Sequence, residues 1–180
     1  MELIAALLDL CKDVAQPIIA IDGPAGAGKT TLAHDIKLAL AQHYAVTEIH
    51  MDDLYNGWDD ALTSQLTRTI TNQILEPVFQ GKSFGYRKYD WLNKRFGDLQ
   101  TYSAPALLIL EGVGAGQKST RKFTDQLIWI DIDMEVGLQR VLNRDGGHLE
   151  TEMRIWQIRE QEHFESENTR ECATIRVDGN

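Results

Sequence analysis

The chain has 180 residues, a formal net charge of −9 and only two cysteines. This length suits a single domain, 1–180, whose core needs no disulfides, and the spacing of Cys11 and Cys172 suggests no metal cage. The negative charge argues against a nucleic acid polymer or a membrane surface as the partner. With an acidic start and no long apolar stretch, we expect a soluble, cytoplasmic protein, either a monomer or a homo-oligomer.

The first half of the chain predicts alternating helices and strands. Apolar residues recur at helical spacing from Leu3 to Val14, so we expect a helix within residues 1–15 that covers the sheet or meets another subunit. The continuous apolar run Ile18 to Ile21 predicts a buried parallel strand. A helix over Thr31 to His43 and a second strand over Ala45 to Met51 follow.

The middle of the chain is less regular. Apolar spacing predicts a helix over Ala61 to Phe79, with Pro77 as an early stop. Residues 84–100 read as a connector rich in aromatic and basic side chains that could bind the acceptor. The apolar run Ala106 to Gly112 predicts a third buried strand.

The remaining elements complete an α/β pattern. We expect a strand over Leu127 to Ile132, helices over Met134 to Arg144 and Glu150 to Glu165, and a short strand over Ala173 to Val177. Alternating strands and helices predict a three-layer α/β fold with a mainly parallel, doubly wound sheet flanked by helices. Loops after the first three strands then meet at one sheet edge.

Residues 23–30 read Gly-Pro-Ala-Gly-Ala-Gly-Lys-Thr, the G-x-x-x-x-G-K-[ST] pattern of a phosphate-binding loop. It lies between a predicted strand and a predicted helix, as the motif requires. Backbone N–H groups hold phosphates there, the lysine reaches the β- and γ-oxygens, and the threonine hydroxyl ligates Mg²⁺. We therefore predict a P-loop NTPase fold that binds ATP and Mg²⁺. The predicted nucleotide contacts are Gly23, Ala25, Gly26, Ala27, Gly28, Lys29, Thr30 and Thr31.

Acidic residues follow the second and third strands. Asp52 is our candidate for the base that accepts the proton of an acceptor hydroxyl. Asp53 and Glu111 are candidates to hold Mg²⁺ together with Thr30. The alternatives are that the aspartates cap a helix or face solvent, and that Glu111 is a surface residue at a strand end.

Basic and aromatic residues supply the other candidates. Arg140 and Arg144 share a helix face at the start of a predicted lid, 140–150, and would cover the transferring phosphate, unless they are solvated helix charges. Tyr89 and Trp91 either stack on a substrate or pack against the domain. Trp156 reads as core. The five histidines show no ligand spacing.

Four segments resemble the uridine kinase and phosphoribulokinase branch of P-loop kinases. Gly23 to Thr31 looks like the nucleotide loop, and Asp52 to Tyr55 is similar to an Asp-x-Phe-Tyr element whose aspartate is the base. Tyr89 to Trp91 resembles a Tyr-Asp-Phe element of the nucleoside pocket, and Arg140 to Asp145 resembles the lid. The family's base-recognising histidine is replaced by Lys94.

The resemblance implies a uridine kinase-like, Mg²⁺-ATP-dependent phosphotransferase that phosphorylates a hydroxyl of a nucleoside or another small metabolite. We assign catalytic roles to Lys29, Asp52, Arg140 and Arg144, and substrate contacts to Asp52, Tyr55, Tyr89, Trp91 and Arg95.

Three alternatives stay open at this point. A nucleoside monophosphate kinase would use Arg87, Lys88 and Arg95 for the acceptor's phosphate. A GTPase is disfavoured because the chain has no Asn-Lys-x-Asp segment. A non-catalytic ATP-binding regulatory module would keep the loop without a productive acceptor pocket.

Overall fold

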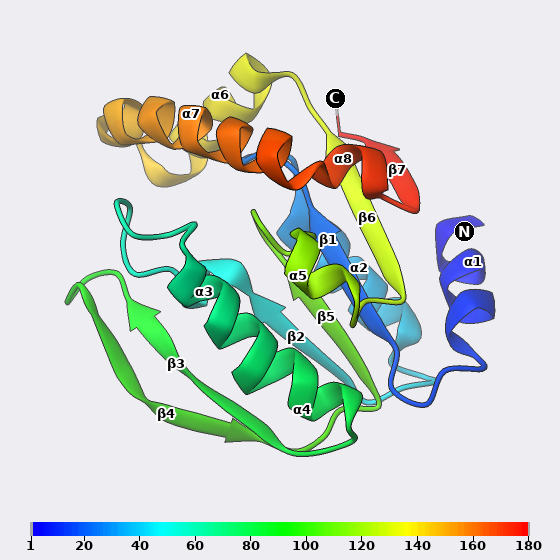
Figure 1. Ribbon diagram of the computed structural model, residues 1–180. Coiled ribbons are helices and arrows are strands. Elements are labelled where there is room, and N and C mark those ends of the chain that lie inside the picture. The colour runs from blue at the N-terminus through cyan, green and yellow to red at the C-terminus, as the bar shows by residue number, and fades with distance from the viewer. Residues whose placement is uncertain (1, 180) are drawn as a thin grey trace.

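The computed structural model describes residues 2–179, in which a five-stranded parallel sheet forms the centre of the molecule (Figure 1). The strand order is β2-β5-β1-β6-β7, and every neighbouring pair runs parallel. The strands of this sheet are β1 (Ile18–Asp22), β2 (Val46–His50), β5 (Leu107–Glu111), β6 (Gln126–Asp131) and β7 (Ile175–Asp178).

Helices and short helical turns connect the strands and cover both faces of the sheet (Figure 1). They are α1 (Glu2–Cys11), α2 (Lys29–Leu40), η1 (Met51–Asp53), α3 (Ser64–Arg68), η2 (Thr69–Leu75), α4 (Glu76–Phe79), α5 (Lys118–Arg121), α6 (Met134–Asp145), η3 (Gly147–Leu149), α7 (Glu150–Glu167) and α8 (Thr169–Cys172). None of the helices in residues 2–179 is long and apolar enough to cross a membrane.

The core has two halves, one on each face of the sheet. Ile19 and Ile109 are buried with residues of α1 and α2, whereas Ile18 and Leu110 are buried with residues of α3, η2, α6 and α7. Side chains alternate between faces along a strand, so a strand buried on both faces is apolar throughout. The predicted three-layer α/β fold with a mainly parallel sheet is therefore confirmed.

Helix α1 packs against its own sheet. Leu7 and Cys11 are fully buried in the half of the core that also contains α2. Of the two roles open for this helix, the structure shows the covering one. The helix ends at Cys11, earlier than the predicted Val14, and the prediction for Met1 lies outside the described residues.

The connector predicted over residues 84–100 is instead an antiparallel hairpin of β3 (Phe84–Asp90) and β4 (Arg95–Tyr102). Tyr86 is buried in β3, but nearly all of β4 is exposed. An exposed strand carries no alternating apolar pattern, which is why the sequence did not reveal it. The hairpin packs beside η2 and η1 (Figure 1).

The helix predicted over Ala61 to Phe79 begins later, at Ser64, and is irregular. Its middle, η2, is a π-helical segment, and α4 follows it directly. Pro77 does not end the helix, which continues from η2 through α4 to Phe79.

Candidate active site

The loop of residues 23–30 joins β1 to α2 at the carboxyl edge of the sheet. Gly28 has a φ of 92° at the amino end of α2, and a Cβ there would meet nothing within 4 Å. This is the open cradle that a phosphate group needs at a helix N-terminus. Two of the predicted nucleotide contacts, Gly23 and Ala27, are buried and do not line the adjacent cavity. The others do line it: Ala25, Gly26, Gly28, Lys29, Thr30 and Thr31.

Lys29 lies across this loop. Its Nζ donates hydrogen bonds to the carbonyl oxygens of Gly23 at 2.8 Å and Pro24 at 2.7 Å, and the side chain is largely buried. These bonds fix the ammonium charge beside the loop's N–H groups. The charge is therefore held where an anion bound by the loop would meet it.

The loop is supported by two buried carboxylates. Asp22, the last residue of β1, accepts from the N–H groups of Gly23 at 2.8 Å, Gly114 at 3.1 Å and Gly116 at 2.8 Å. Glu160 of α7 accepts from the N–H of Ala25 at 3.0 Å. Burial raises the pKa of Asp22 to about 6 and that of Glu160 to about 7. No local pattern pointed to Glu160, because it lies 135 residues from Ala25 in the chain.

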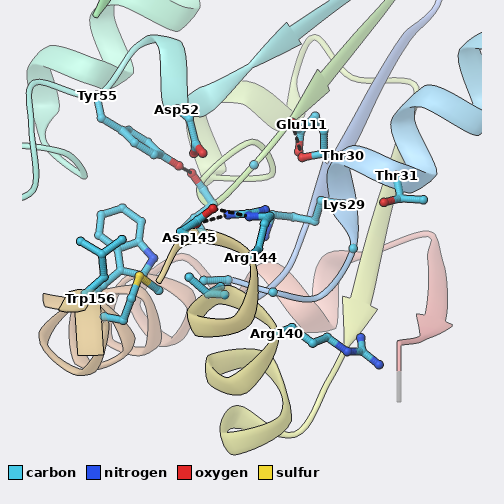
Figure 2. A pocket seen from close by; sticks show the side chains of 18 of the residues that line it. Lys29, Thr30, Thr31, Asp52, Tyr55, Glu111, Arg140, Arg144, Asp145 and Trp156 are labelled. Carbon is cyan, nitrogen blue, oxygen red and sulfur yellow. Dashed lines mark hydrogen bonds and ion pairs between the residues drawn. The ribbon is translucent and has the colours of Figure 1, made fainter. Parts of the chain in front are cut away.

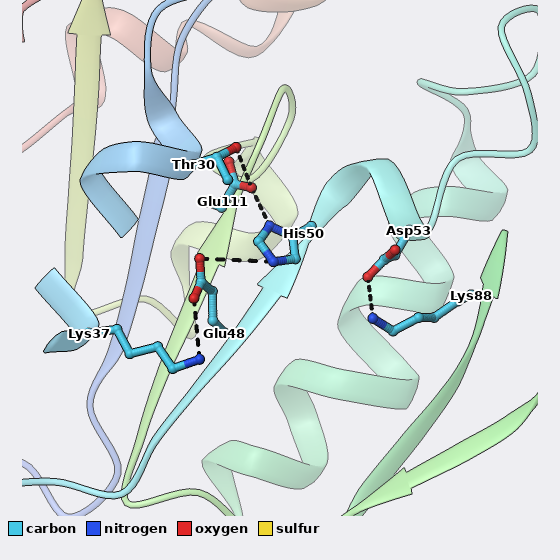
Figure 3. Close-up of polar contacts among 7 residues, drawn as sticks. All are labelled: Thr30, Lys37, Glu48, His50, Asp53, Lys88 and Glu111. Carbon is cyan, nitrogen blue, oxygen red and sulfur yellow. Dashed lines mark hydrogen bonds and ion pairs between the residues drawn. The ribbon is translucent and has the colours of Figure 1, made fainter. Parts of the chain in front are cut away.

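Thr30 and Glu111 meet at the end of β5. The Thr30 hydroxyl donates to Glu111 Oε1 at 3.0 Å, and His50 Nδ1 lies 2.5 Å from the same oxygen (Figure 3). His50 ends β2 opposite Glu111 in the register of the sheet. The hydrogen bond to Glu111 raises the pKa of His50. The position of His50 at a strand end, just before the acidic loop, was the overlooked signal.

This pair fits a magnesium ion. A hydroxyl and a carboxylate are hard oxygen donors, which Mg²⁺ prefers, and Mg²⁺ in phosphate-transferring sites takes few protein ligands. No cluster of three or more His, Cys, Asp or Glu residues suited to a metal occurs within residues 2–179.

Asp52 faces the cavity from η1, directly after β2 (Figure 2). Its side chain is open to the cavity, yet protein atoms surround it on the other sides. This burial raises the pKa of its carboxyl group, against the opposing effect of the Lys29 charge. The indole of Trp91 donates to the backbone carbonyl of Asp52 at 3.0 Å, which ties the hairpin to this position.

Asp53 is directed elsewhere. Its carboxylate pairs with Lys88 of β3 at 2.7 Å, and Figure 3 shows this pair pointing away from Thr30 and Glu111. Asp53 does not line the cavity. The turn of η1 separates the two neighbouring aspartates, so the structure does not bring Asp53 to the predicted metal position.

The cavity measures about 500 Å³ and extends from the loop to an aromatic wall. Arg144 lines the cavity, as Lys29 does, and its guanidinium donates two hydrogen bonds, at 2.8 and 2.7 Å, to Asp145 (Figure 2). Arg140 also lines the cavity, but it points away from Arg144 and donates to the Gly179 carbonyl at 2.7 Å.

The predicted substrate contacts divide into two groups. Tyr55 and Trp91 line the cavity. Tyr89 does not, and packs instead on Trp91 and Phe96, with ring centroids 5.1 and 5.2 Å away. Arg95 is exposed at the start of β4, outside the cavity lining.

Several lining residues were not predicted as part of the site, among them three with large side chains. Trp156, expected in the core, is buried and also lines the cavity together with Trp58 and Met153 (Figure 2). Met153 and Trp156 come from α7, far along the chain from the acidic loop. Their spacing of three residues places Met153 and Trp156 on one helix face, but spacing alone does not predict that this face borders a cavity.

A P-loop between the first strand and the following helix, with acidic side chains at the same sheet edge, defines the class: an α/β protein with the P-loop fold. No protein-family model matches the chain. The uridine kinase of Lactobacillus helveticus (strain DPC 4571) is 27% identical over 145 residues, which cover 71% of this chain and 67% of the relative.

Solved structures show the same fold. One described as a possible uridine kinase from Bacillus stearothermophilus has a TM-score of 0.71 and 23% identity, covering 99% of this chain and 100% of that one. Shikimate kinase from Bacteroides thetaiotaomicron has a TM-score of 0.53 and 17% identity, covering 91% and 86%. The predicted resemblance to P-loop kinases of the uridine kinase type is confirmed, and these similarities together support a small-molecule kinase.

Proposed function

We propose that the chain is a Mg²⁺-ATP-dependent phosphotransferase that phosphorylates a hydroxyl group of a small molecule. One observation carries the proposal: a single cavity joins the phosphate-binding loop, the Thr30–Glu111 pair and the Asp52 carboxylate. Phosphoryl transfer needs a phosphate cradle, a metal and a group that accepts the proton of the acceptor. The similarity to uridine kinases supports the same reading.

The loop and Lys29 bind the ATP phosphates in this proposal, with the N–H groups around Gly28 facing them. Thr30 and Glu111 hold Mg²⁺, which supplies positive charge against the phosphate oxygens. Asp22 and Glu160 keep the loop in shape through its own N–H groups.

Asp52 accepts the proton of the acceptor hydroxyl. Its raised pKa brings the carboxylate closer to the neutral range in which a general base works best. Arg144 leaves Asp145 to cover charge on the transferring group, since it lines the same cavity as Lys29 and Asp52. Arg140 would have to release the Gly179 carbonyl to take part in the same way.

The basic residues weigh against a nucleoside monophosphate kinase. Arg87 donates to the Gly97 carbonyl at 2.9 Å, Lys88 pairs with Asp53, and Arg95 is exposed. None of the three lines the cavity. A phosphorylated acceptor would therefore lack a dedicated cation, so we favour an uncharged alcohol. The open space beside Asp52 weighs against a purely regulatory ATP-binding module.

The test compares two neighbouring aspartates. Asp52→Asn is expected to lower kcat by roughly 10²–10⁴-fold with nucleotide affinity retained, because only the proton acceptor is lost. Asp53→Asn is the matched control: it makes the same change one residue away, outside the cavity, and is expected to keep most of the turnover. Equal turnover by Asp52→Asn and the unmodified chain would remove Asp52 from this role.

The proposed setting is the cytoplasm, where Cys11 and Cys172 stay reduced. Both are free cysteines, and Cys172 is exposed.

A further inference from the structure

A series of polar contacts runs from the proposed magnesium pair to the edge strand of the sheet (Figure 3). The Thr30 hydroxyl and the His50 imidazole both contact Glu111 Oε1, at 3.0 and 2.5 Å. The other ring nitrogen of His50, Nε2, lies 3.9 Å from Glu48 Oε1, and Glu48 Oε2 lies 3.4 Å from the Nζ atom of Lys37. Because Thr30 and Lys37 both belong to α2, the series begins and ends on one helix.

Strand register places the three middle side chains on one face of the sheet. Glu48 and His50 are two residues apart in β2, so their side chains point to the same face. Glu111 of β5 is the register partner of His50, so the two side chains lie next to each other on that face. The contact between His50 and Glu111 is therefore built into the sheet and does not depend on the path of a loop.

The hydrogen bond between His50 and Glu111 has a defined direction. An ionised carboxylate only accepts, so the N–H group at Nδ1 donates to Glu111 Oε1, as the Thr30 hydroxyl also does. Only 5% of the Glu111 side chain is exposed, so water competes little for these bonds. Two donors on Oε1 fix the orientation of the carboxylate, and its second oxygen, Oε2, remains for an ion.

The imidazole ring of His50 is itself restrained. Its side chain is 37% exposed, so burial alone does not fix the ring. The Glu48 side chain is only 7% exposed, and a carboxylate buried to this extent needs polar or charged partners. Lys37 and His50 supply them from two sides. Glu48 thus holds the ring with Nδ1 directed at Glu111.

We propose that His50 is a positioning residue for the magnesium ion: its Nδ1–H group holds the Glu111 carboxylate beside Thr30, so that both oxygen donors are in place before the metal binds. The inference rests on the proposed function, because it concerns the same metal pair. Partners that hydrogen-bond to a metal-binding carboxylate set its orientation, and their loss lowers metal affinity by roughly 10–100-fold. The alternative is that His50 only stabilises the end of β2.

Paramagnetic resonance of Mn²⁺, used in place of Mg²⁺, measures metal affinity without turnover. The full chain is kept in excess over the non-hydrolysable ATP analogue AMP-PNP, so that the metal binds to the complex. His50→Leu is expected to raise the Kd for Mn²⁺ roughly tenfold or more and to leave the metal-free affinity for AMP-PNP unchanged. His50→Asn has an amide N–H group where histidine has Nδ1–H, and it is expected to keep most of the metal affinity.

Two further variants separate a positioning role from a structural one. His43→Leu makes the same change at an exposed histidine beyond the end of α2, and the Kd for Mn²⁺ is expected to stay the same. His50→Leu combined with Glu111→Gln is expected to bind Mn²⁺ no more weakly than Glu111→Gln alone, because His50 acts through Glu111.

Three results would overturn the positioning role of His50. One is an unchanged Kd for Mn²⁺ in a folded His50→Leu variant, with or without a lower melting temperature. Another is an equal loss of metal affinity in His50→Leu and His50→Asn. The third is a full additional loss when His50→Leu is added to Glu111→Gln, since His50 would then act independently of that carboxylate.

Metal binding and turnover test separate claims. Mn²⁺ binding that depends on His50, without acceptor-dependent ADP formation, would remove the proposed function and keep the positioning role. ADP formation whose Mg²⁺ requirement responds to Glu111→Gln but not to His50→Leu would keep the kinase and overturn the positioning role. An unmodified chain whose AMP-PNP complex binds no Mn²⁺ would overturn both the metal pair and the role of His50.

Discussion

Glu160 joins two parts of the site through one buried carboxyl group. It accepts from the Ala25 N–H of the loop and hydrogen-bonds to Trp156, which lines the cavity. Helix α7 thus holds the loop in a fixed position relative to Trp156. A carboxyl group in this apolar position keeps its proton to higher pH than an exposed glutamate does, which is why its pKa rises to about 7.

This shift makes stability depend on pH. Between the ordinary glutamate pKa of 4.5 and about 7, the folded chain holds a proton that the unfolded chain releases, so rising pH favours unfolding. Glu160→Gln is uncharged at every pH and is expected to flatten the fall in melting temperature between pH 5 and pH 8. Parallel curves for the variant and the unmodified chain would show that Glu160 does not titrate in this range.

Thr30 and Glu111 carry the proposed magnesium site. Thr30→Ala and Glu111→Gln are each expected to raise the Mg²⁺ concentration for half-maximal turnover by about tenfold or more, because each removes or weakens a hard oxygen donor. Asp53→Asn is expected to leave that concentration unchanged, since Asp53 pairs with Lys88. If that concentration were unchanged in Thr30→Ala and Glu111→Gln, these two residues would not be the ligands of Mg²⁺.

At the scale of elements, α6 rests directly on the loop. A Cβ on Gly137 would lie 2.6 Å from the Ala25 carbonyl oxygen, and one on Gly26 would lie 2.2 Å from the Gly137 carbonyl oxygen. The two backbones approach so closely that only glycine fits between them. The loop's shape therefore depends on a helix that begins more than 100 residues later in the chain.

Gly137→Ala is expected to push α6 off the loop. We expect nucleotide affinity to fall roughly tenfold and stability to fall by about 1–3 kcal/mol, measured by calorimetric titration and thermal unfolding. Gly147→Ala makes the same change where a Cβ meets nothing within 4 Å, and both quantities are expected to stay the same. If the two variants had the same nucleotide affinity and the same stability, the close contact between α6 and the loop would not matter for either property.

Local sequence patterns predicted the elements whose environment is uniform along their length. The strands around Ile18–Asp22 and Leu107–Glu111 are buried on both faces, so an unbroken apolar run marks each. Strand β4 is exposed, and its sequence has no such apolar run. The phosphate loop could also be predicted from the sequence, because its glycines and lysine lie within one short segment.

The rest of the candidate site depends on contacts between distant segments. His50 meets Glu111 through strand register, and Trp156 reaches the cavity through the packing of α7. Asp52 and Asp53 are neighbours in sequence, yet a turn directs one to the cavity and the other to Lys88. No local pattern distinguishes such side chains before the fold is known.

At the scale of the whole molecule, one parallel sheet brings its strand ends to the same edge (Figure 1), and the phosphate loop, Asp52, Glu111 and α6 line one cavity there. The hairpin and α7 close the cavity from the sides with tryptophans. We propose that residues 1–180 act as a single unit, since the site draws on segments from Gly23 to Glu160.

The most direct measurement follows ADP formation from Mg²⁺-ATP across a panel of nucleosides, nucleoside monophosphates, sugars and other small alcohols, with Asp52→Asn as the control. The proposed function predicts ADP formation that depends on a neutral alcohol and falls by roughly 10²-fold or more in the variant. Confirmed ATP binding without acceptor-dependent ADP formation, or equal rates in the variant, would contradict it.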